Sequence, residues 1–507
     1  MYTVLAKNVT TNYMNNQLLI QFFHWYYNDN QPLWEKAAQE AKHLATLGIT
    51  RVWLPPAYKG TEGVDSVGYD SYDMYDLGEF DQKNSVVTKY GSKKEYLNAI
   101  AALHENGVEV IADVVFNHKA GADELEKVGV RTVNNDNRSE FTSELMEIDA
   151  WTKFTFPGRK GKYSDFVWDQ HCFSGVDHAE NLHQDAIYSI QNNYGEMWED
   201  VPSGEMGNFD YLMYNDIETR NPAVREELKR WGEWYYNTCK MDGFRLDAVK
   251  HIAHDFLNEW IDHMKHTFKR DFFFVAENWI VDNLKELEDY VAMTEGRTQL
   301  FDSLLHHNLY QASLQGNEYN LSTIFQGTLV QTHPELSITF VDNHDTQPLQ
   351  SLTAYVDYWF RPLAYALILL REQGIPCVFY PDLYGGKYRD ENEEGVEVDV
   401  ELVPLAELPD LCIIRRDKSY GIQRDYIDHP NCIGWTREGE DDKPDSGLAV
   451  VMSNSAEGHK HMEMGQKHAG KTFVDAMGKR KEEITVNEEG WAEFYCLGGS
   501  VSVWVLK

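Results

Sequence analysis

Short apolar runs of β type alternate with helical patterns along most of this chain, and this alternation constrains the fold more than any other feature. Strands that alternate with helices of about 10–15 residues are typical of a parallel sheet with crossover helices. The expected strands lie at residues 18–23, 50–54, 108–115, 243–246, 272–276, 299–302, 337–341 and 376–380. Eight parallel strands are the number that closes a barrel. The sequence therefore predicts an α/β fold, a (β/α)8 TIM barrel.

Helical periodicity between the expected strands supports this prediction. Residues 33–47 place apolar side chains three or four positions apart, and Gly48 follows them as a C-cap. Further helices are expected at 92–106, 222–239, 254–268, 283–293, 356–373 and 401–416. The acidic stretch 389–399 is expected to be a solvated loop.

The alternation is interrupted in one place and ends in another. Residues 119–218 are rich in Asn, Asp, Gly and aromatic side chains without a long-range period, which indicates a domain inserted after the third strand. From residue 418 onward, short alternating strands with Gly and Asn turns indicate an antiparallel β-sandwich. We therefore expect a barrel domain at 1–118 and 219–417, an inserted domain at 119–218 and a C-terminal domain at 418–507.

Charge and composition exclude several classes of partner. The formal net charge of −36 argues against binding to nucleic acid or to an anionic membrane surface. No apolar run approaches membrane-spanning length, and the first residues lack the basic and apolar regions of a signal peptide. The cysteines are far apart and form no CxxC motif, which predicts buried free thiols. We expect a cytoplasmic monomer, or a secreted protein if a leader has been removed.

The end of the fourth expected strand carries an arginine and an aspartate two positions apart. Strand alternation puts Arg245 and Asp247 on the same face, so Arg245 can hydrogen-bond Asp247 and hold its carboxylate ionised. Such a carboxylate can act as a nucleophile or can stabilise positive charge. An isolated Arg-x-Asp is more often a structural ion pair, so the interpretation depends on what accompanies it.

Three further expected strands end in polar groups of the same kind. The third ends in Asn117 and His118, the fifth in Glu277, and the seventh in His344 and Asp345. Active sites of (β/α)8 barrels lie at the C-terminal ends of the strands. Carboxylates gathered there with an arginine and two histidines suit glycoside hydrolysis through an oxocarbenium-like transition state.

Four segments of the chain resemble the conserved regions of the α-amylase family, glycoside hydrolase family 13. They are DVVFNH at 113–118, GFRLDAVKH at 243–251, VAEN at 275–278 and FVDNHD at 340–345. The likeness extends over nearly the whole chain, including WLPPAYKG at 53–60 and VGYDSY at 67–72, and is strongest toward bacterial liquefying-type and cytoplasmic α-amylases. It implies a barrel with an inserted domain B after the third strand and a C-terminal β-sandwich domain C.

The resemblance implies a role for each carboxylate. Asp247 resembles the nucleophile, and Asp345 resembles the carboxylate that binds the distorted sugar at the cleaved bond. Glu277 resembles the general acid/base, and we expect the charges of Asp247 and Asp345 to raise its pKa. The implied substrate contacts are Arg245, which orients Asp247, Tyr69 as a stacking platform, His118 and His344 on the same sugar, and Lys250, His251 and Trp279 toward the leaving group.

The resemblance also implies a calcium ion that joins the inserted domain to the barrel. Its ligands would be Asn117, Asp210, Asp216 and the backbone carbonyl of His251. Oxygen donors of this kind suit Ca²⁺.

The function implied is that of an endo-acting, retaining α-amylase. It would cut internal α-1,4 bonds of starch, glycogen and maltodextrins through a covalent glycosyl-enzyme, with α-glucans and maltooligosaccharides as its partners. An exo-acting maltooligosaccharide-forming amylase or α-glucosidase of the same family is the alternative among enzymes, because loops of domain B decide product length. A catalytically inert glycan-binding protein on the same fold is disfavoured by the intact Arg245, Asp247, Glu277 and Asp345. A phosphate-binding metabolic barrel would require a glycine-rich loop after its last strands, where this chain has Asn343 to Asp345 instead.

Overall fold

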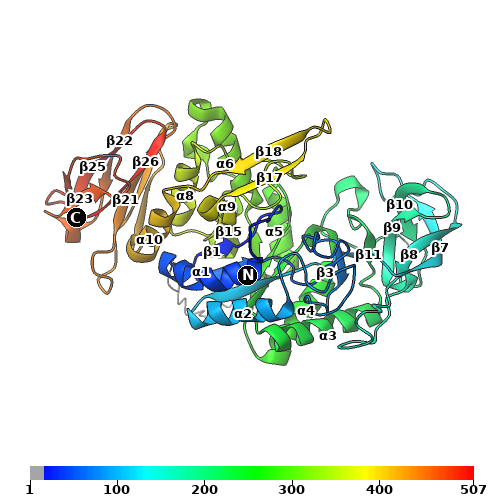
Figure 1. The fold of residues 1–507 in the computed structure, drawn as a ribbon. Helices are drawn as coiled ribbons and strands as arrows, with labels where there is room; N and C mark the ends of the chain where they lie inside the picture. The colour runs from blue at the N-terminus through cyan, green and yellow to red at the C-terminus, as the bar shows by residue number, and fades with distance from the viewer. Residues whose placement is uncertain (1–15, 196) are drawn as a thin grey trace, which may run out of the picture.

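Eight parallel strands close a barrel in the computed structural model, which describes residues 16–195 and 197–507 (Figure 1). They are β1 (Leu19–Gln21), β2 (Arg51–Leu54), β5 (Glu109–Val114), β12 (Gly243–Leu246), β13 (Phe273–Ala276), β14 (Gln299–Phe301), β15 (Ser337–Phe340) and β16 (Ile375–Phe379). The last strand, β16, pairs with β1 and so completes the circle. These strands coincide with the expected ones, so the predicted TIM barrel is confirmed. Residues 1–15, which bear on the expectation of no signal peptide, lie outside the described residues.

Helices surround the barrel, and their ends follow local sequence signals. They are α1 (Leu33–Leu47), α2 (Lys93–Glu105), α3 (Pro222–Cys239), α4 (His254–Phe268), α5 (Leu284–Met293), α6 (Ser303–Gln315), α7 (Leu329–Thr332), α8 (Arg361–Leu369), α9 (Tyr380–Tyr384) and α10 (Leu408–Lys418). Gly48 ends α1 in the left-handed conformation, at φ 88°, as expected of a C-cap. Ser92 and Glu95 form a capping box at the start of α2.

Three expectations for the region after β15 differ from the structure. The helix expected at 356–373 is shorter in the structure and forms α8. Pro362 has no backbone N–H to donate within a helix, so it fits only the first turn, and the helix begins beside it. The acidic loop expected at 389–399 is a hairpin of β17 (Gly386–Glu391) and β18 (Glu397–Leu402). Valines alternate with acidic residues from 396 to 401, which is a strand pattern that the high charge concealed. The helix expected at 401–416 begins later, at Leu408.

An antiparallel sheet is inserted between β5 and β12, at the right of Figure 1. Its strands, in spatial order, are β6 (His118–Lys119), β11 (Asn215–Ile217), β9 (Phe173–Ala179), β10 (Gln184–Ile190), β7 (Glu124–Thr132) and β8 (Met146–Lys153). The first strand of the insertion pairs with the last, with His118 opposite Asp216. Both ends of the insertion therefore meet beside the barrel rim. A short pair, β3 (Lys59–Gly60) and β4 (Ser71–Asp73), lies between β2 and α2 in the chain.

The C-terminal region is antiparallel β structure, as expected. One sheet has the order β19 (Gln423–Tyr426), β20 (Cys432–Arg437), β21 (Leu448–Ser453), β26 (Ser500–Leu506), β23 (Thr472–Asp475) and β24 (Ile484–Thr485), and a second pairs β22 (Gly458–Glu463) with β25 (Trp491–Cys496). Phe473, Phe494 and Trp504 are buried together in a core of this region.

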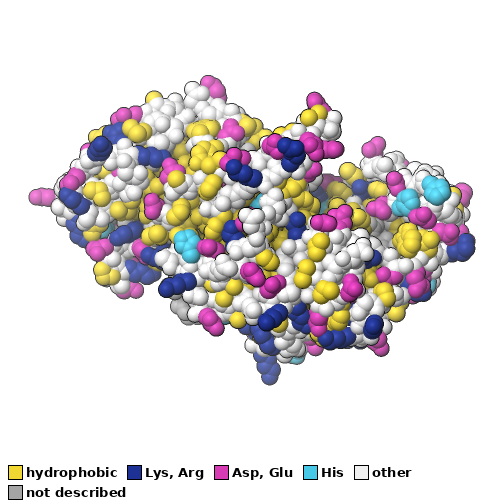
Figure 2. Space-filling view, in the orientation of Figure 1, with side chains coloured by type: hydrophobic (Ala, Val, Ile, Leu, Met, Phe, Trp, Pro, Cys, Tyr) yellow, Lys and Arg dark blue, Asp and Glu magenta, His cyan; other side chains and the backbone are white. Residues whose placement is uncertain are grey.

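The cysteines are buried and free, and acidic side chains are distributed over the surface. All six cysteines are buried and free, as expected. Asp and Glu side chains are spread over the whole face shown in Figure 2 rather than gathered in one patch. In the part of the chain that the structure describes, no helix is both long and apolar enough to cross a bilayer.

Candidate active site

One buried arginine joins carboxylates from three barrel strands. The side chain of Arg245, on β12, is 1% exposed, and its Nη1 donates to Asp247 and, at 3.0 Å, to Asp113 on β5. Its Nη2 donates at 2.6 Å to Glu277, which follows β13 directly. The parallel register explains this convergence, because Arg245 lies beside Asp113 in one ladder and beside Val275 in the other. The C-terminal ends of neighbouring strands thus place three carboxylates around one guanidinium.

Burial dominates the protonation of these carboxylates. It raises the pKa of Glu277 to about 8, with Arg245 opposing the rise and Asp247 and Asp345 adding to it. Burial likewise raises the pKa of Asp345 to about 7, against Arg245 and with the help of Asp247. The upward direction for Glu277 agrees with the sequence prediction, but water exclusion, rather than neighbouring charge, is the larger cause. Burial also raises the pKa of Asp247. The positive charge of Arg245 lowers that pKa, but by less than burial raises it.

Aromatic rings stack beside these carboxylates. The rings of Tyr69 and His344 are stacked with centroids 5.1 Å apart, and Trp25 stacks against Tyr69 at 5.7 Å. The hydroxyl of Tyr69 donates to Asp113 at 2.9 Å. The Nε2 of His344 lies 3.4 Å from a carboxylate oxygen of Asp345. The predicted stacking residue, one predicted histidine and the third carboxylate therefore lie together.

Asp113 and Trp25 belong to this constellation, and the sequence reasoning did not select them. Asp113 is fully buried and also accepts a hydrogen bond of 2.9 Å from the indole of Trp53. Pairing the expected third and fourth strands in parallel register would have placed Asp113 opposite Arg245. Trp25 follows β1, and no local signal beyond the aromatic run around it marks it.

His118 contacts the protein through both ring nitrogens. Its Nε2 lies 2.8 Å from the carbonyl of Tyr69 and donates to it, while Nδ1 accepts at 3.3 Å from the amide of Asn117. Burial lowers the pKa of His118 to about 4, so the ring is neutral at neutral pH. Burial and Arg245 lower the pKa of His344 as well. His118 thus supports the backbone of Tyr69, and its direct contact with sugar stays a prediction.

Lys250 and His251 bind the inserted region. Lys250 donates at 2.7 Å to Glu205 and, more weakly, to the carbonyl of Trp279 at 3.4 Å. The Nδ1 of His251 lies 2.6 Å from the carbonyl of Phe209 and donates to it. These contacts connect the segment after β12 to residues 205–209 of the insertion, and the ring of Trp279 is partly buried against the barrel core.

The residues expected to hold calcium form a buried polar group. The amide nitrogen of Asn117 donates to Asp216 at 3.4 Å, and Asp210 accepts from the backbone N–H of Glu199 at 2.9 Å. The amide oxygen of Asn117 is buried without a hydrogen-bond partner. Burial raises the pKa of Asp210 to about 7 and also raises that of Asp216, which Asp210 increases further.

This group fits a hard cation. An ion with oxygen ligands would satisfy the Asn117 oxygen and offset the repulsion between Asp210 and Asp216. Within the described residues, no three His, Cys, Asp or Glu side chains converge as a metal centre. Any ion here would therefore need amide and backbone oxygens besides the two carboxylates.

A barrel whose carboxyl rim holds carboxylates around an arginine has the architecture of a barrel glycoside hydrolase. Residues 34–402 match the family described as alpha amylase, catalytic domain, and residues 448–505 match alpha-amylase C-terminal. The chain therefore belongs to the α-amylase family, and its activity is the hydrolysis of α-1,4-glucosidic bonds.

Known proteins resemble the chain over almost its full length. It is 49% identical to the cytoplasmic alpha-amylase of Escherichia coli K12, over 97% of this chain and 99% of that protein. It is 45% identical to the glucan 1,4-alpha-maltohexaosidase of Bacillus sp. strain 707, over 97% of this chain and 93% of that protein. The structure of the α-amylase from Geobacillus thermoleovorans complexed with acarbose matches it with a TM-score of 0.63 at 17% identity, covering 97% of this chain and 98% of that one. At that identity the structural likeness concerns the fold alone.

Proposed function

We propose that the chain is an endo-acting, retaining α-amylase in which Asp247 is the nucleophile and Glu277 the general acid/base. The observation that carries this proposal is the shared guanidinium of Arg245, which binds both side chains and so holds them next to each other. Retaining glycosidases need their two carboxyl groups about 5–5.5 Å apart, whereas inverting enzymes need about 6.5–9.5 Å to admit a water. Two carboxyl groups on one guanidinium suit the shorter spacing.

Asp247 attacks the anomeric carbon of the bound glucose unit. Its Oδ1 accepts from Arg245, and its side chain is 10% exposed. The attack forms a C–O bond to the enzyme while the bond to the leaving glucan breaks. Arg245 fixes the orientation of the carboxylate during this step.

Glu277 supplies the proton for the leaving oxygen. Its Oε2 accepts from Arg245 and from the backbone N–H of Ala248 at 3.2 Å, so the proton resides on Oε1. With a pKa of about 8, Glu277 is protonated at neutral pH, as a general acid requires. Once it has donated, the carboxylate takes a proton from the water that releases the sugar from Asp247, and the acid form is restored.

The surrounding groups bind the sugar and the ion. Asp345 is proposed to hold hydroxyls of the distorted sugar. The ring of Tyr69 would stack beneath this sugar, and His344 would lie beside the sugar. Ca²⁺ would be held by Asn117, Asp210, Asp216 and the carbonyl of His251, and would supply a fixed positive charge that joins both ends of the insertion. Lys250, His251 and Trp279 are proposed to line the leaving-group side.

The organisation and setting of the enzyme complete the proposal. We assign the barrel domain to 1–118 and 219–417, domain B to 119–218 and domain C to 418–507. We propose a monomer that acts on glycogen, starch and maltodextrins. A cytoplasmic location is proposed from the likeness to a relative named cytoplasmic alpha-amylase.

The products decide between endo and exo action. A mixture of oligosaccharides early in a time course on amylose supports internal cleavage. The exo alternative has one observation in its favour, the 45% identity to a maltohexaosidase, and it would release one size from the start. NMR of the first products tests the stereochemistry, because retention gives the α anomer and inversion gives the β anomer.

A further inference from the structure

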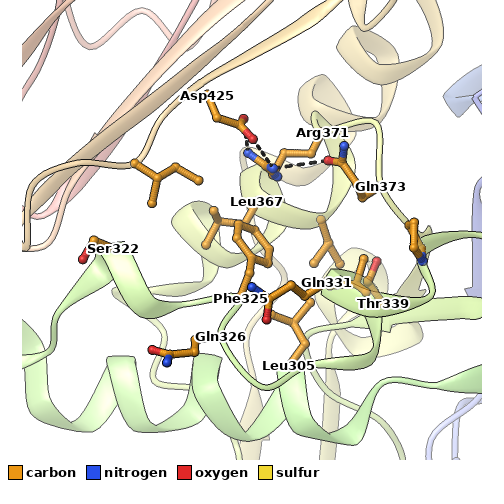
Figure 3. Close-up of a pocket in the computed structure, with 14 residues that line it drawn as sticks. Leu305, Ser322, Phe325, Gln326, Gln331, Thr339, Leu367, Arg371, Gln373 and Asp425 are labelled. Atoms are coloured by element: carbon orange, nitrogen blue, oxygen red, sulfur yellow. Dashed lines mark hydrogen bonds and ion pairs between the residues drawn. The ribbon is translucent and has the colours of Figure 1, made fainter. Parts of the chain in front are cut away.

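A pocket of about 660 Å³ lies away from the carboxylates, where the outer barrel helices meet the C-terminal sheet (Figure 3). Its wall includes residues of α6, α8, the segment 322–334 and β19. None of the described residues that line it belongs to the candidate active site. The volume is within the range of about 300–1,000 Å³ that is typical of small-molecule sites.

The charges of this pocket are satisfied internally. Arg371 donates to both oxygens of Asp425, at 2.6 and 2.9 Å, and to the amide oxygen of Gln373 at 3.2 Å. Figure 3 shows these three side chains together at one end of the pocket. An anion would have to displace Asp425, and a cation would meet the guanidinium of Arg371. The pocket therefore favours a neutral ligand.

The remaining wall combines an aromatic surface with hydrogen-bonding groups. Phe325 is partly buried, with the guanidinium of Arg371 4.6 Å from its ring centroid. Gln326 and Gln331 are exposed at the pocket, and the amide oxygen of Gln331 accepts from the N–H of Gly327 at 3.1 Å. The hydroxyl of Thr339, which is 1% exposed, is buried without a partner. Apolar surface beside the exposed amide groups of Gln326 and Gln331 matches a ligand with both C–H faces and hydroxyls.

We propose that this pocket is a second α-glucan site that binds a short stretch of a maltooligosaccharide or of a starch chain. The choice of glucan rests on the proposed function, whereas the neutrality and mixed polarity of the ligand rest on the pocket itself. A chain held here keeps the polymer near the enzyme and raises the effective concentration of cleavable bonds. The site should therefore matter for polymers and be irrelevant for short substrates.

The first test counts binding sites. Maltoheptaose is titrated into the Glu277→Gln protein by calorimetry, with cellohexaose as a β-linked control. The proposal expects two maltoheptaose sites per chain and no binding of cellohexaose at the second. It also expects Gln326→Trp, which places a large side chain at the pocket, to remove one site. Gln315→Trp is the matched control, because Gln315 is an exposed glutamine on neighbouring α6 and does not line the pocket.

The second test does not depend on the Glu277 assignment. Adsorption of otherwise unaltered protein to granular starch is measured on ice, and hydrolysis of a nitrophenyl maltoside is measured at working temperature. Gln326→Trp should weaken adsorption about three- to tenfold and leave the small-substrate rate unchanged, while Gln315→Trp should change neither. A single maltoheptaose site, or unchanged adsorption by Gln326→Trp, overturns the second site. Full activity of Glu277→Gln instead counts against the catalytic assignment.

Discussion

Asp113 and Arg245 lie opposite each other in the β5–β12 ladder, and the Nη1 that donates to Asp113 at 3.0 Å also donates to Asp247. A single positive charge is thus shared among Asp113, Asp247 and Glu277. The site carries more acidic groups than basic ones, which suits a transition state in which positive charge develops on the sugar.

Replacing Asp247 by asparagine should abolish turnover without unfolding the protein. The amide keeps the size of the side chain but cannot form the covalent intermediate, so we expect a loss of about four orders of magnitude or more in kcat. Starch hydrolysis and circular dichroism are the measurements. The matched control is Asp242→Asn. Asp242 also pairs with an arginine, Arg270, but it lies just before the N-terminal end of β12, at the opposite end of the strand from Asp247. Near-normal hydrolysis by folded Asp247→Asn protein would exclude the proposed nucleophile.

The activity should fall as the pH rises through about 8. Glu277 must hold a proton to act as an acid, and its pKa of about 8 means that the protonated form is lost above that pH and retained below it. The alkaline limb of kcat/KM should report this group. In Glu277→Gln protein the limb should disappear together with most of the rate. An unchanged limb in that variant would contradict the acid/base assignment.

Asparagine at Asp113 should slow the reaction without removing any group that touches the sugar. Arg245 would lose one charged acceptor, a loss worth about 1.5–3 kcal/mol, so kcat should fall by about 10- to 100-fold. Because the carboxylate positions Arg245, Tyr69 and Trp53 and is not proposed to touch the sugar, KM for a maltooligosaccharide should change much less than kcat. A fall confined to the melting temperature, with kcat intact, would make Asp113 a structural residue only.

Chelation should lower both stability and activity if calcium binds as proposed. An ion that binds only the folded protein stabilises it by mass action. Removing it leaves Asp210 and Asp216 buried beside each other and the oxygen of Asn117 unsatisfied. We expect EDTA to lower the melting temperature and the rate, and added calcium to restore both. Asp210→Asn should weaken the calcium response. A metal-free sample that melts and works like the untreated protein would rule out the ion.

The sequence was informative where the determining relations are local. Strand and helix periods located every barrel strand, and the two-residue spacing of Arg245 and Asp247 predicted their contact. Asp113 was missed because its contact with Arg245 spans 132 positions and depends on barrel register. The cause of the pKa of Glu277 was misjudged for a related reason: a sequence shows which charges neighbour a residue but not how completely the fold excludes water.

The pairing of β6 with β11 has a consequence for how this enzyme can change. The insertion leaves and re-enters the barrel through two adjacent, hydrogen-bonded strands, so its distant strands can lengthen or shorten without moving the ends of β5 and β12. Arg245 and its carboxylates are held by the barrel ladders, which that variation leaves intact. The outer part of the insertion can thereby change without altering the catalytic carboxylates, and we expect new product lengths to arise when that part is exchanged as a unit.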